Sequence, residues 1–378
     1  MAKSEPKLDV LVLGEHPAAY LAAALLRFKS KLAVTHATIP SEHVPDRLVV
    51  VNPEFFDLHP LVEGLRRKLE LNPIYGARFL GNDPATASEF RSKAAVVSVG
   101  SYKDIRNAVM KVAEEQDVEL LTPKVLHVHR LDEGGLDITL GKHEVRPKVI
   151  VLAGKLAADQ ERMLGMPEAW GPDIVHRYTF VKIKGSKGVE LGNRPILPMS
   201  LDLNNMLTWA WLLAGKQYTQ LAVEQPVESL GAVPAKTLLA GWVEVLRKHG
   251  VLGADARVAL EAAEYMDLPL AGALAHEGLA NRTLLVGPAG GFYSACSEDI
   301  YPNCWSAVFA ADAIKKGLKE LHLQDALQPY RHKWRTTLGD YLRGPQQNLR
   351  FLLPLVYRNQ VMTNRLAESI LLGKSVVR

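Results

Sequence analysis

The chain has 378 residues, of which 48% are hydrophobic and 23% charged, and a formal net charge of +4, so it is long enough for two domains or one elaborated domain. It contains no Lys/Arg block with interleaved aromatic residues and no apolar run long enough to span a bilayer, so we expect no nucleic-acid ligand and no membrane-spanning helix. The polar start leaves no room for a signal peptide, and the two cysteines, Cys296 and Cys304, cannot form a disulfide framework, so we expect a cytoplasmic protein.

Residues 8–28 carry the pattern around which the chain is organised. The sequence LDVLVLGEHPAAYLAAALLRF joins a Val- and Leu-rich run to Gly14, a compact turn and an Ala/Leu-rich segment with helical spacing. This order is typical of the strand, turn and helix that open a dinucleotide-binding unit, where backbone N–H groups at the helix start face a pyrophosphate. The usual G-x-G-x-x-G fingerprint reads Gly14, His16 and Ala19 here, so only its first glycine is present.

Further strands and helices follow as far as residue 165. A second strand is predicted over 31–36, where a fold of this kind ends with Asp or Glu to bind ribose; Thr35 and His36 stand there instead. The other predicted elements are strands over 48–51, 94–99, 119–121, 124–130, 136–140 and 148–152, and helices over 59–71 and 102–116.

The pattern changes between residues 167 and 269. Strand-like runs over 178–183 and 218–223, the stretch MLTWAWLL and a helix over about 234–249 indicate an inserted mixed domain. The dinucleotide unit resumes with a strand over 282–287, and the tail is helical in pattern. We therefore predict an α/β fold in which 1–165 and 278–320 form a Rossmann-like nucleotide-binding domain with a parallel sheet, 166–277 an inserted mixed β-sheet domain and 321–378 a helical C-terminal region.

The late segment is the most specific part of the sequence. Gly287, Pro288, Ala289, Gly290 and Gly291 follow the resumed strand, and the sequence SEDI and a helix over 307–318 come next. Together with the opening unit and the insertion, this order resembles the FAD-dependent flavoproteins that include geranylgeranyl reductases, aromatic hydroxylases and flavin-dependent halogenases. The run WAWLL is similar both to the W-x-W-x-I-P motif of the halogenases and to the Y-x-W-x-F-P strand of the reductases.

The resemblance implies the fold of an FAD/NAD(P)-binding Rossmann-like sheet and FAD as the cofactor. It places the FAD-binding positions at Gly14, His16, Ala19, His36, Gly287, Pro288, Ala289, Gly290 and Gly291, and substrate-binding positions at Trp209 and Trp211. The polar contacts expected of the family are replaced throughout. The Asp that touches the ribityl chain is Pro288, the Arg that starts the long helix is Ser101 or Tyr102, and the ribose carboxylate is missing at Thr35 and His36.

Several of these residues have two interpretations. His16 either contacts a phosphate or fills the space that a cofactor would otherwise occupy, because a side chain there obstructs close backbone approach. His36 is either a contact on the adenosine side or a solvated histidine at a strand end. Trp209 and Trp211 point to one face of a strand, where they line either an apolar substrate cavity or an inter-domain core.

The sequence therefore predicts a divergent flavin-dependent oxidoreductase, related to the reductases or to the monooxygenases and halogenases, that holds FAD weakly and acts on an apolar prenyl or aromatic substrate. The alternative is a cofactor-free protein that binds a ligand or partner on the same fold. The spacing identifies no general acid or base, so the catalytic residues stay unknown, and no metal site is expected. The basic and apolar C-terminal region either contacts a membrane surface peripherally or packs as an ordinary domain helix.

Overall fold

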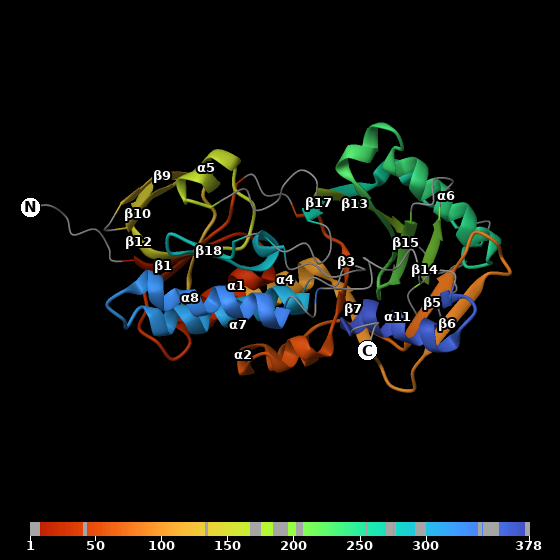
Figure 1. Cartoon of the computed structure of the whole chain (residues 1–378), viewed down its shortest axis with the longest axis horizontal. Helices are drawn as coiled ribbons and strands as arrows, with labels where there is room; N and C mark the ends of the chain where they lie inside the picture. Colours follow the sequence, from red (N-terminus) through yellow and green to blue (C-terminus); the bar gives the residue numbers. More distant parts are fainter. Residues whose placement is uncertain are drawn as a thin grey trace, which may run out of the picture.

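A computed structural model describes residues 8–40, 44–132, 135–166, 175–183, 196–201, 207–253, 256–269, 275, 277–291, 300–338, 342 and 355–374. The chain forms an elongated molecule with one large sheet toward each end (Figure 1). Within the described part of the chain, no helix has both the length and the apolar content needed to cross a membrane.

The first sheet has six strands in the order β18-β19-β12-β1-β2-β8. Their bounds are Leu279–Ala280, Thr283–Leu285, Pro147–Leu152, Leu8–Leu13, Val34–Ala37 and Glu119–Leu121. All neighbouring strands in it are parallel except the β18–β19 pair. The prediction that the strands near residues 9–13, 148–152 and 283–286 share one largely parallel sheet is confirmed, because each is a short apolar run buried on both faces.

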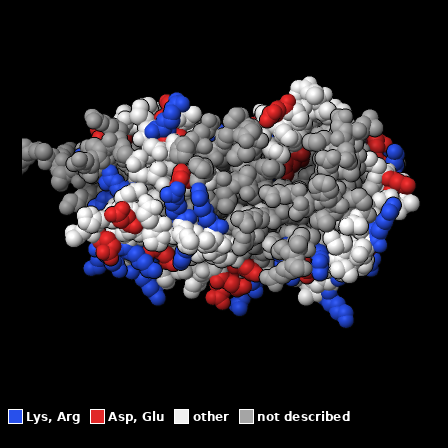
Figure 2. All heavy atoms as spheres, viewed as in Figure 1, with Lys and Arg blue, Asp and Glu red and all other residues white. Residues whose placement is uncertain are grey.

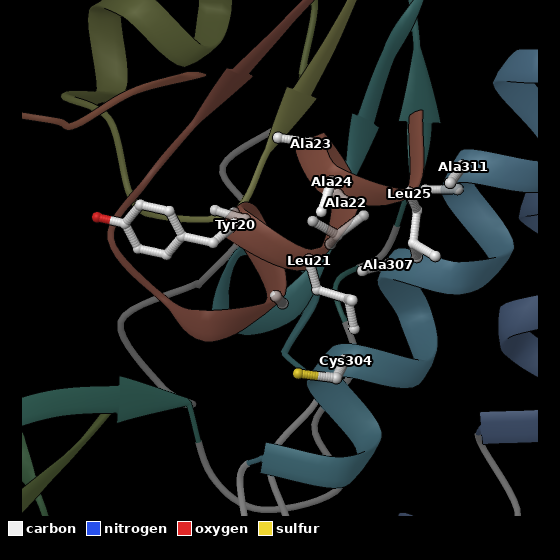
Figure 3. Packing of buried hydrophobic residues seen from close by; sticks show 14 of the residues in the cluster. Tyr20, Leu21, Ala22, Ala23, Ala24, Leu25, Cys304, Ala307 and Ala311 are labelled. Atoms are coloured by element: carbon white, nitrogen blue, oxygen red, sulfur yellow. The ribbon is translucent and has the colours of Figure 1, made fainter. Parts of the chain in front are cut away.

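Both faces of this sheet are covered. Helices α1 (Pro17–Arg27), α4 (Tyr102–Glu114) and α7 (Ile300–Gly317) share one hydrophobic core with the sheet, and α8 (Leu323–Lys333) packs on α7. Strands β9 (Leu126–Asp132), β10 (Gly135–Leu140) and β11 (His143–Val145) form a small antiparallel sheet whose apolar residues pack on the other face. The Ala-rich faces of α1 and α7 lie close together, with Leu21 and Leu25 directed toward Cys304, Ala307 and Ala311 (Figure 3).

The second sheet has seven strands in the order β17-β13-β16-β15-β14-β5-β6. Their bounds are Glu264–Pro269, Val175–Ile183, Thr219–Pro226, Leu207–Ala214, Ile196–Leu201, Gly76–Leu80 and Ala87–Arg91. Helix α6 (Ala235–Lys248) packs on one face and α11 (Gln360–Leu372) on the other, each through its own hydrophobic cluster (Figure 1). Strands β5 and β6 come from before residue 165, so the sheet does not follow the expected boundary, and the division into domains stays a prediction.

The remaining elements connect these layers. They are the antiparallel strands β3 (Leu48–Val51), β7 (Val97–Ser101) and β4 (Asn72–Ile74), the helices α2 (Pro60–Glu63), α3 (Leu65–Lys68) and α5 (Ala158–Met163), and single turns at Pro53–Asp57, Val227–Gly231, Leu260–Ala262, Gly287–Gly290 and Trp334–Leu338. The helix predicted over 59–71 is wrong as a single element, because it is interrupted at Gly64 and the chain becomes extended at Leu69.

Gly14 provides a direct test of the sheet packing. It has a φ of 126°, and a Cβ atom there would lie 2.8 Å from the carbonyl carbon of Ala153. We expect Gly14→Ala to lower the free energy of unfolding by about 3 kcal/mol, since backbone strain alone costs about 1–3 kcal/mol. Urea unfolding measures the change. Gly64→Ala is the control, because φ is −64° and nothing lies within 4 Å of its Cβ position; equal effects of the two substitutions would contradict the packing described.

Candidate functional site

The carboxyl ends of β1, β12 and β19 meet at one edge of the first sheet, which is where parallel α/β folds bind ligands. Gly14 ends β1 and lies against Ala153 after β12. Gly287 follows β19 with a φ of 57°, and a Cβ on it would lie 3.2 Å from Ala18 Cβ and 3.6 Å from His16 Nδ1. The two glycines are thus brought together, although β12 separates their strands.

The backbone N–H groups at the start of α1 have hydrogen-bond partners within the chain. His16 is the N-cap, and its Nδ1 accepts a hydrogen bond of 3.0 Å from the Ala18 N–H. The Ala19 N–H donates to the His16 carbonyl at 2.8 Å, and Pro17 has no N–H. The first-turn donors that would face a pyrophosphate are therefore already engaged, and the His16 side chain is only 2% exposed. This arrangement favours the interpretation that His16 fills space.

A buried aromatic and cationic group lies behind His16. The ring centroids of His16 and Tyr102 are 5.8 Å apart, and the Arg47 guanidinium carbon lies 4.0 Å from the centroid of the Tyr102 ring. Arg47 is 1% exposed and its carbonyl accepts from the Tyr102 N–H at 2.8 Å. A guanidinium stacked on an aromatic face keeps a favourable electrostatic contact without water. Tyr102 thus packs beside the turn, and Ser101 serves as the side-chain N-cap of α4.

Helix α4 places Arg106 against the turn that follows Gly14, where it forms an ion pair with Glu15. Arg106 lies one helical turn after Tyr102, and its Nη1 is 3.1 Å from the Glu15 carboxylate. Both side chains are 25% exposed, and the Arg106 Nε is buried without a hydrogen-bond partner among the described residues. Sequence reasoning missed both residues. The i, i+4 spacing from Tyr102, which places Arg106 on the same face of α4, was the available indication.

The second strand ends one residue later than predicted. β2 ends at Ala37, which accepts a hydrogen bond of 3.1 Å from the Gly14 N–H, so the ribose-facing strand end is apolar. Thr35 instead donates to Glu119 on β8 at 2.8 Å. His36 is 1% exposed, so its interpretation as a solvated histidine is wrong.

His36 contacts the Gly14 turn through its buried imidazole. Its Nε2 lies 2.8 Å from the Gly14 carbonyl, to which it donates, and its ring stacks on Tyr20 with centroids 4.3 Å apart. Its Nδ1 is buried without a partner among the described residues. Burial lowers the pKa of His36 from 6.5 to about 4, against a smaller raising effect of the Gly14 carbonyl. The imidazole is therefore neutral at pH 7.

A cavity opens at the carboxyl ends of β2, β8 and β12. Its volume is 320 Å³, and it is lined by residues that follow those strands: Ile39, Pro40, Lys124, Val125, Leu126, Leu156, Ala157 and Gln160. A largely apolar hollow of this size with a few polar groups is typical of a small-molecule subsite. No motif marks these residues, so only their position after strand ends could have indicated them.

The segment after β19 is also buried. Gly287, Pro288, Ala289 and Gly290 form a tight turn, and Gly291 follows with a φ of 73°. The Gly287 N–H donates to Ser306 Oγ at 2.9 Å, and Ser306 Oγ donates to the Asn303 carbonyl at 2.6 Å. Pro288 offers no carboxylate. The sequence SEDI before α7 is described only from Ile300, and Cys296 lies outside the described residues.

The two tryptophans lie on β15, where residues two apart share a face. Trp211 is 1% exposed and belongs to the core of the second sheet, with its ring centroid 5.3 Å from that of Tyr178. This burial favours the inter-domain core over a substrate cavity at Trp211. The side chain of Trp209 lies outside the described residues. Among the residues the structure describes, no group of three His, Cys, Asp or Glu side chains is arranged to hold a metal ion.

Comparison with known proteins identifies the fold. No family model and no curated protein match the sequence. Among solved structures, a geranylgeranyl bacteriochlorophyll reductase-like protein from Thermoplasma acidophilum is similar with a TM-score of 0.69 and 12% identity over 98% of this chain and 93% of its own. A flavoprotein/dehydrogenase from Cytophaga hutchinsonii has a TM-score of 0.70 at 16% identity, with coverages of 97% and 93%. A variant of halogenase PltM, solved in complex with FAD, has a TM-score of 0.70 at 14% identity, with coverages of 95% and 79%.

The chain therefore shares the fold of these solved structures, and the resemblance drawn from the sequence is confirmed for the fold. The residues present fit a flavin dinucleotide in part. The cavity after β2 suits a nucleoside and Arg106 is near the turn, but His16 occupies the first-turn donors and no carboxylate stands at Ala37 or Pro288.

Proposed function

We propose that this protein is a divergent flavin-dependent oxidoreductase that holds FAD weakly and acts on an apolar prenyl or aromatic molecule in the cytoplasm. The observation that carries this proposal is the 320 Å³ cavity at the carboxyl ends of β2, β8 and β12. Folds of this kind place a nucleotide in that crevice. The similarity to flavin enzymes over nearly the whole chain supports the same class.

The chain's own residues would bind and orient the cofactor, which supplies the redox chemistry when bound. The cavity residues Ile39, Val125 and Leu156 would enclose the adenine end. Arg106 would have to exchange its ion pair with Glu15 for a phosphate oxygen, and the buried turn at Gly287 would exclude water from the far side. Gly14 keeps the turn close to β12.

Weak binding follows from the missing carboxylates. A hydrogen bond to a charged group is worth on the order of 1.5–3 kcal/mol, and two are absent. A tenfold change in affinity corresponds to about 1.4 kcal/mol, so the loss of both contacts without replacement weakens FAD binding by roughly two to four powers of ten.

The substrate side of the proposal rests on the resemblance of the run WAWLL on β15 to strands of the reductases and halogenases, with a small apolar substrate as the proposed ligand and no nucleic acid. The Trp211 side chain packs in the core of the second sheet, so it does not itself support a substrate cavity. The apolar residues of α11, including Leu366 and Ile370, are buried against this sheet. A peripheral membrane contact would therefore have to use the outer face of the C-terminal region rather than this apolar stripe.

A second candidate, a cofactor-free binding protein on the same fold, is favoured by one observation. The His16 side chain satisfies the Ala18 N–H and is nearly fully buried, so the turn is complete without a ligand.

Anaerobic purification, absorbance at the flavin bands and calorimetric titration with FAD distinguish the two. We expect measurable but dissociable binding, because the crevice is present and the charged contacts are missing. No binding at high flavin concentration would leave the cofactor-free protein, whereas stoichiometric, non-dissociating flavin would contradict weak binding.

A further inference from the structure

The β5–β6 hairpin and α11 lie at the opposite end of the molecule from the first sheet (Figure 1). A second cavity lies between this hairpin and the N-terminal half of α11. Its volume is 630 Å³ and it is lined by Arg78, Ala87, Ser88, Glu89, Arg91, Gln360 and Asn364. None of these positions belongs to the dinucleotide pattern, and all but Ala87 carry a polar side chain. Figure 2 shows Lys and Arg side chains at this end of the molecule.

The charges in this cavity are not balanced. Arg91 Nη2 lies 2.8 Å from the Glu89 carboxylate, so that pair is neutral overall. Arg78 lies opposite Glu89 in the strand register and is half-buried, yet it forms no ion pair or hydrogen bond with any described residue. A partly desolvated guanidinium without a counter-charge is costly, and an anion removes that cost.

Neutral donors line the same cavity. Ser88 Oγ is buried without a hydrogen-bond partner among the described residues. Gln360 Nε2 donates to the Glu89 carbonyl and to Asn364 Oδ1, both at 2.8 Å, which fixes the Asn364 amide so that its oxygen is occupied and its N–H₂ group remains to donate. Guanidinium, hydroxyl and amide donors in one hollow are the groups that bind a tetrahedral oxyanion.

We propose that this cavity is an oxyanion site that binds a phosphate group, with Arg78 as its principal ligand. The site is independent of the flavin crevice and of the activity proposed above. The phosphate belongs either to a soluble phosphorylated compound or to an anionic lipid head group, and the two sources share this chemistry.

Calorimetric titration of the full-length protein with inorganic phosphate at low salt tests the site. We expect Arg78→Gln to weaken binding at least tenfold, which is about 1.4 kcal/mol, because it removes a charge-assisted contact. Arg365→Gln is the matched control: it removes the same charge from the exposed side of α11, one residue from Asn364 and outside the cavity. Arg91→Gln, at a side chain that is 73% exposed, keeps the test available if Arg78→Gln lowers stability, and we expect it to weaken binding less.

Absence of phosphate binding by the unaltered protein, or equal binding by Arg78→Gln and Arg365→Gln, would overturn the proposal. Co-sedimentation with phosphatidylglycerol and phosphatidylcholine vesicles identifies the source. Arg78-dependent binding to the anionic vesicles alone indicates a head group, and phosphate binding without vesicle binding indicates a soluble compound. Vesicle binding that does not depend on Arg78, without phosphate binding, would also contradict the site.

Discussion

Replacing His16 by glycine should raise the affinity for FAD by about ten- to a hundredfold. The substitution removes the imidazole that accepts from the Ala18 N–H, so this donor becomes available to a phosphate. A hydrogen bond to a charged group is worth on the order of 1.5–3 kcal/mol, which corresponds to the expected change in affinity. Glycine is also tolerated at an N-cap at a cost of only a few tenths of a kcal/mol, so α1 should persist. Calorimetric titration with FAD measures the effect.

The chain offers a closely matched control for this substitution. His59 is also an N-cap followed by proline, and its Nδ1 accepts from the Leu61 N–H at 3.2 Å, but it begins α2 and not α1. His59→Gly should leave FAD binding unchanged. If His16→Gly binds FAD no better than the unaltered protein, the His16 side chain is not what limits access to the turn.

Stability should fall by about 3 kcal/mol as the pH drops from 6.5 toward 4, because of His36 alone. Burial lowers the pKa of His36 to about 4 in the folded protein, against 6.5 for an exposed histidine. Between these values the unfolded chain binds a proton that the folded protein does not, so acid favours unfolding. Above pH 6.5 the protein therefore loses no stability through His36, and below about pH 4 the loss is complete.

Urea unfolding at a series of pH values measures this loss. The variant His36→Gln keeps an N–H donor for the Gly14 carbonyl but cannot be protonated, so its stability should fall less steeply over the same range. His143→Gln removes an exposed imidazole and should follow the unaltered protein. Parallel pH profiles for the unaltered protein and His36→Gln would contradict a neutral, buried His36.

The first sheet could be predicted from the sequence because the pattern that marks each of its main strands lies within that strand and the residues next to it. Each of β1, β12 and β19 is an apolar run that ends at or near a glycine, and a strand buried on both faces must be apolar throughout. The end of β2 was placed one residue early, because the run around Ala37 gives no local indication of its register. Register is set by pairing with β1 on one side and with β8 on the other, and β8 lies far away in the sequence.

The polar residues of the site could not be predicted from the sequence, because they come together only through contacts between distant segments. Glu15 and Arg106 are 91 residues apart and no motif links them, so only the packing of α4 on α1 reveals the pair. The replaced cofactor contacts could be identified by position, but sequence could not show that the His16 imidazole caps its own helix. That depends on a side-chain rotamer, which is selected by burial next to Tyr102.

The order of strands in the first sheet also constrains when this protein can fold. Its strands lie within residues 8–37, 119–121, 147–152 and 279–285, and β12 lies between β1 and β19. The sheet is therefore complete only after the last of these segments has been made. During synthesis, the opening strand can pair with β2 early, but the helix α7 that covers α1 is made only after residue 300. Contacts this distant in sequence form slowly and leave apolar surface exposed in the meantime. The Ala-rich face of α1 therefore stays exposed on the nascent chain until α7 has been made.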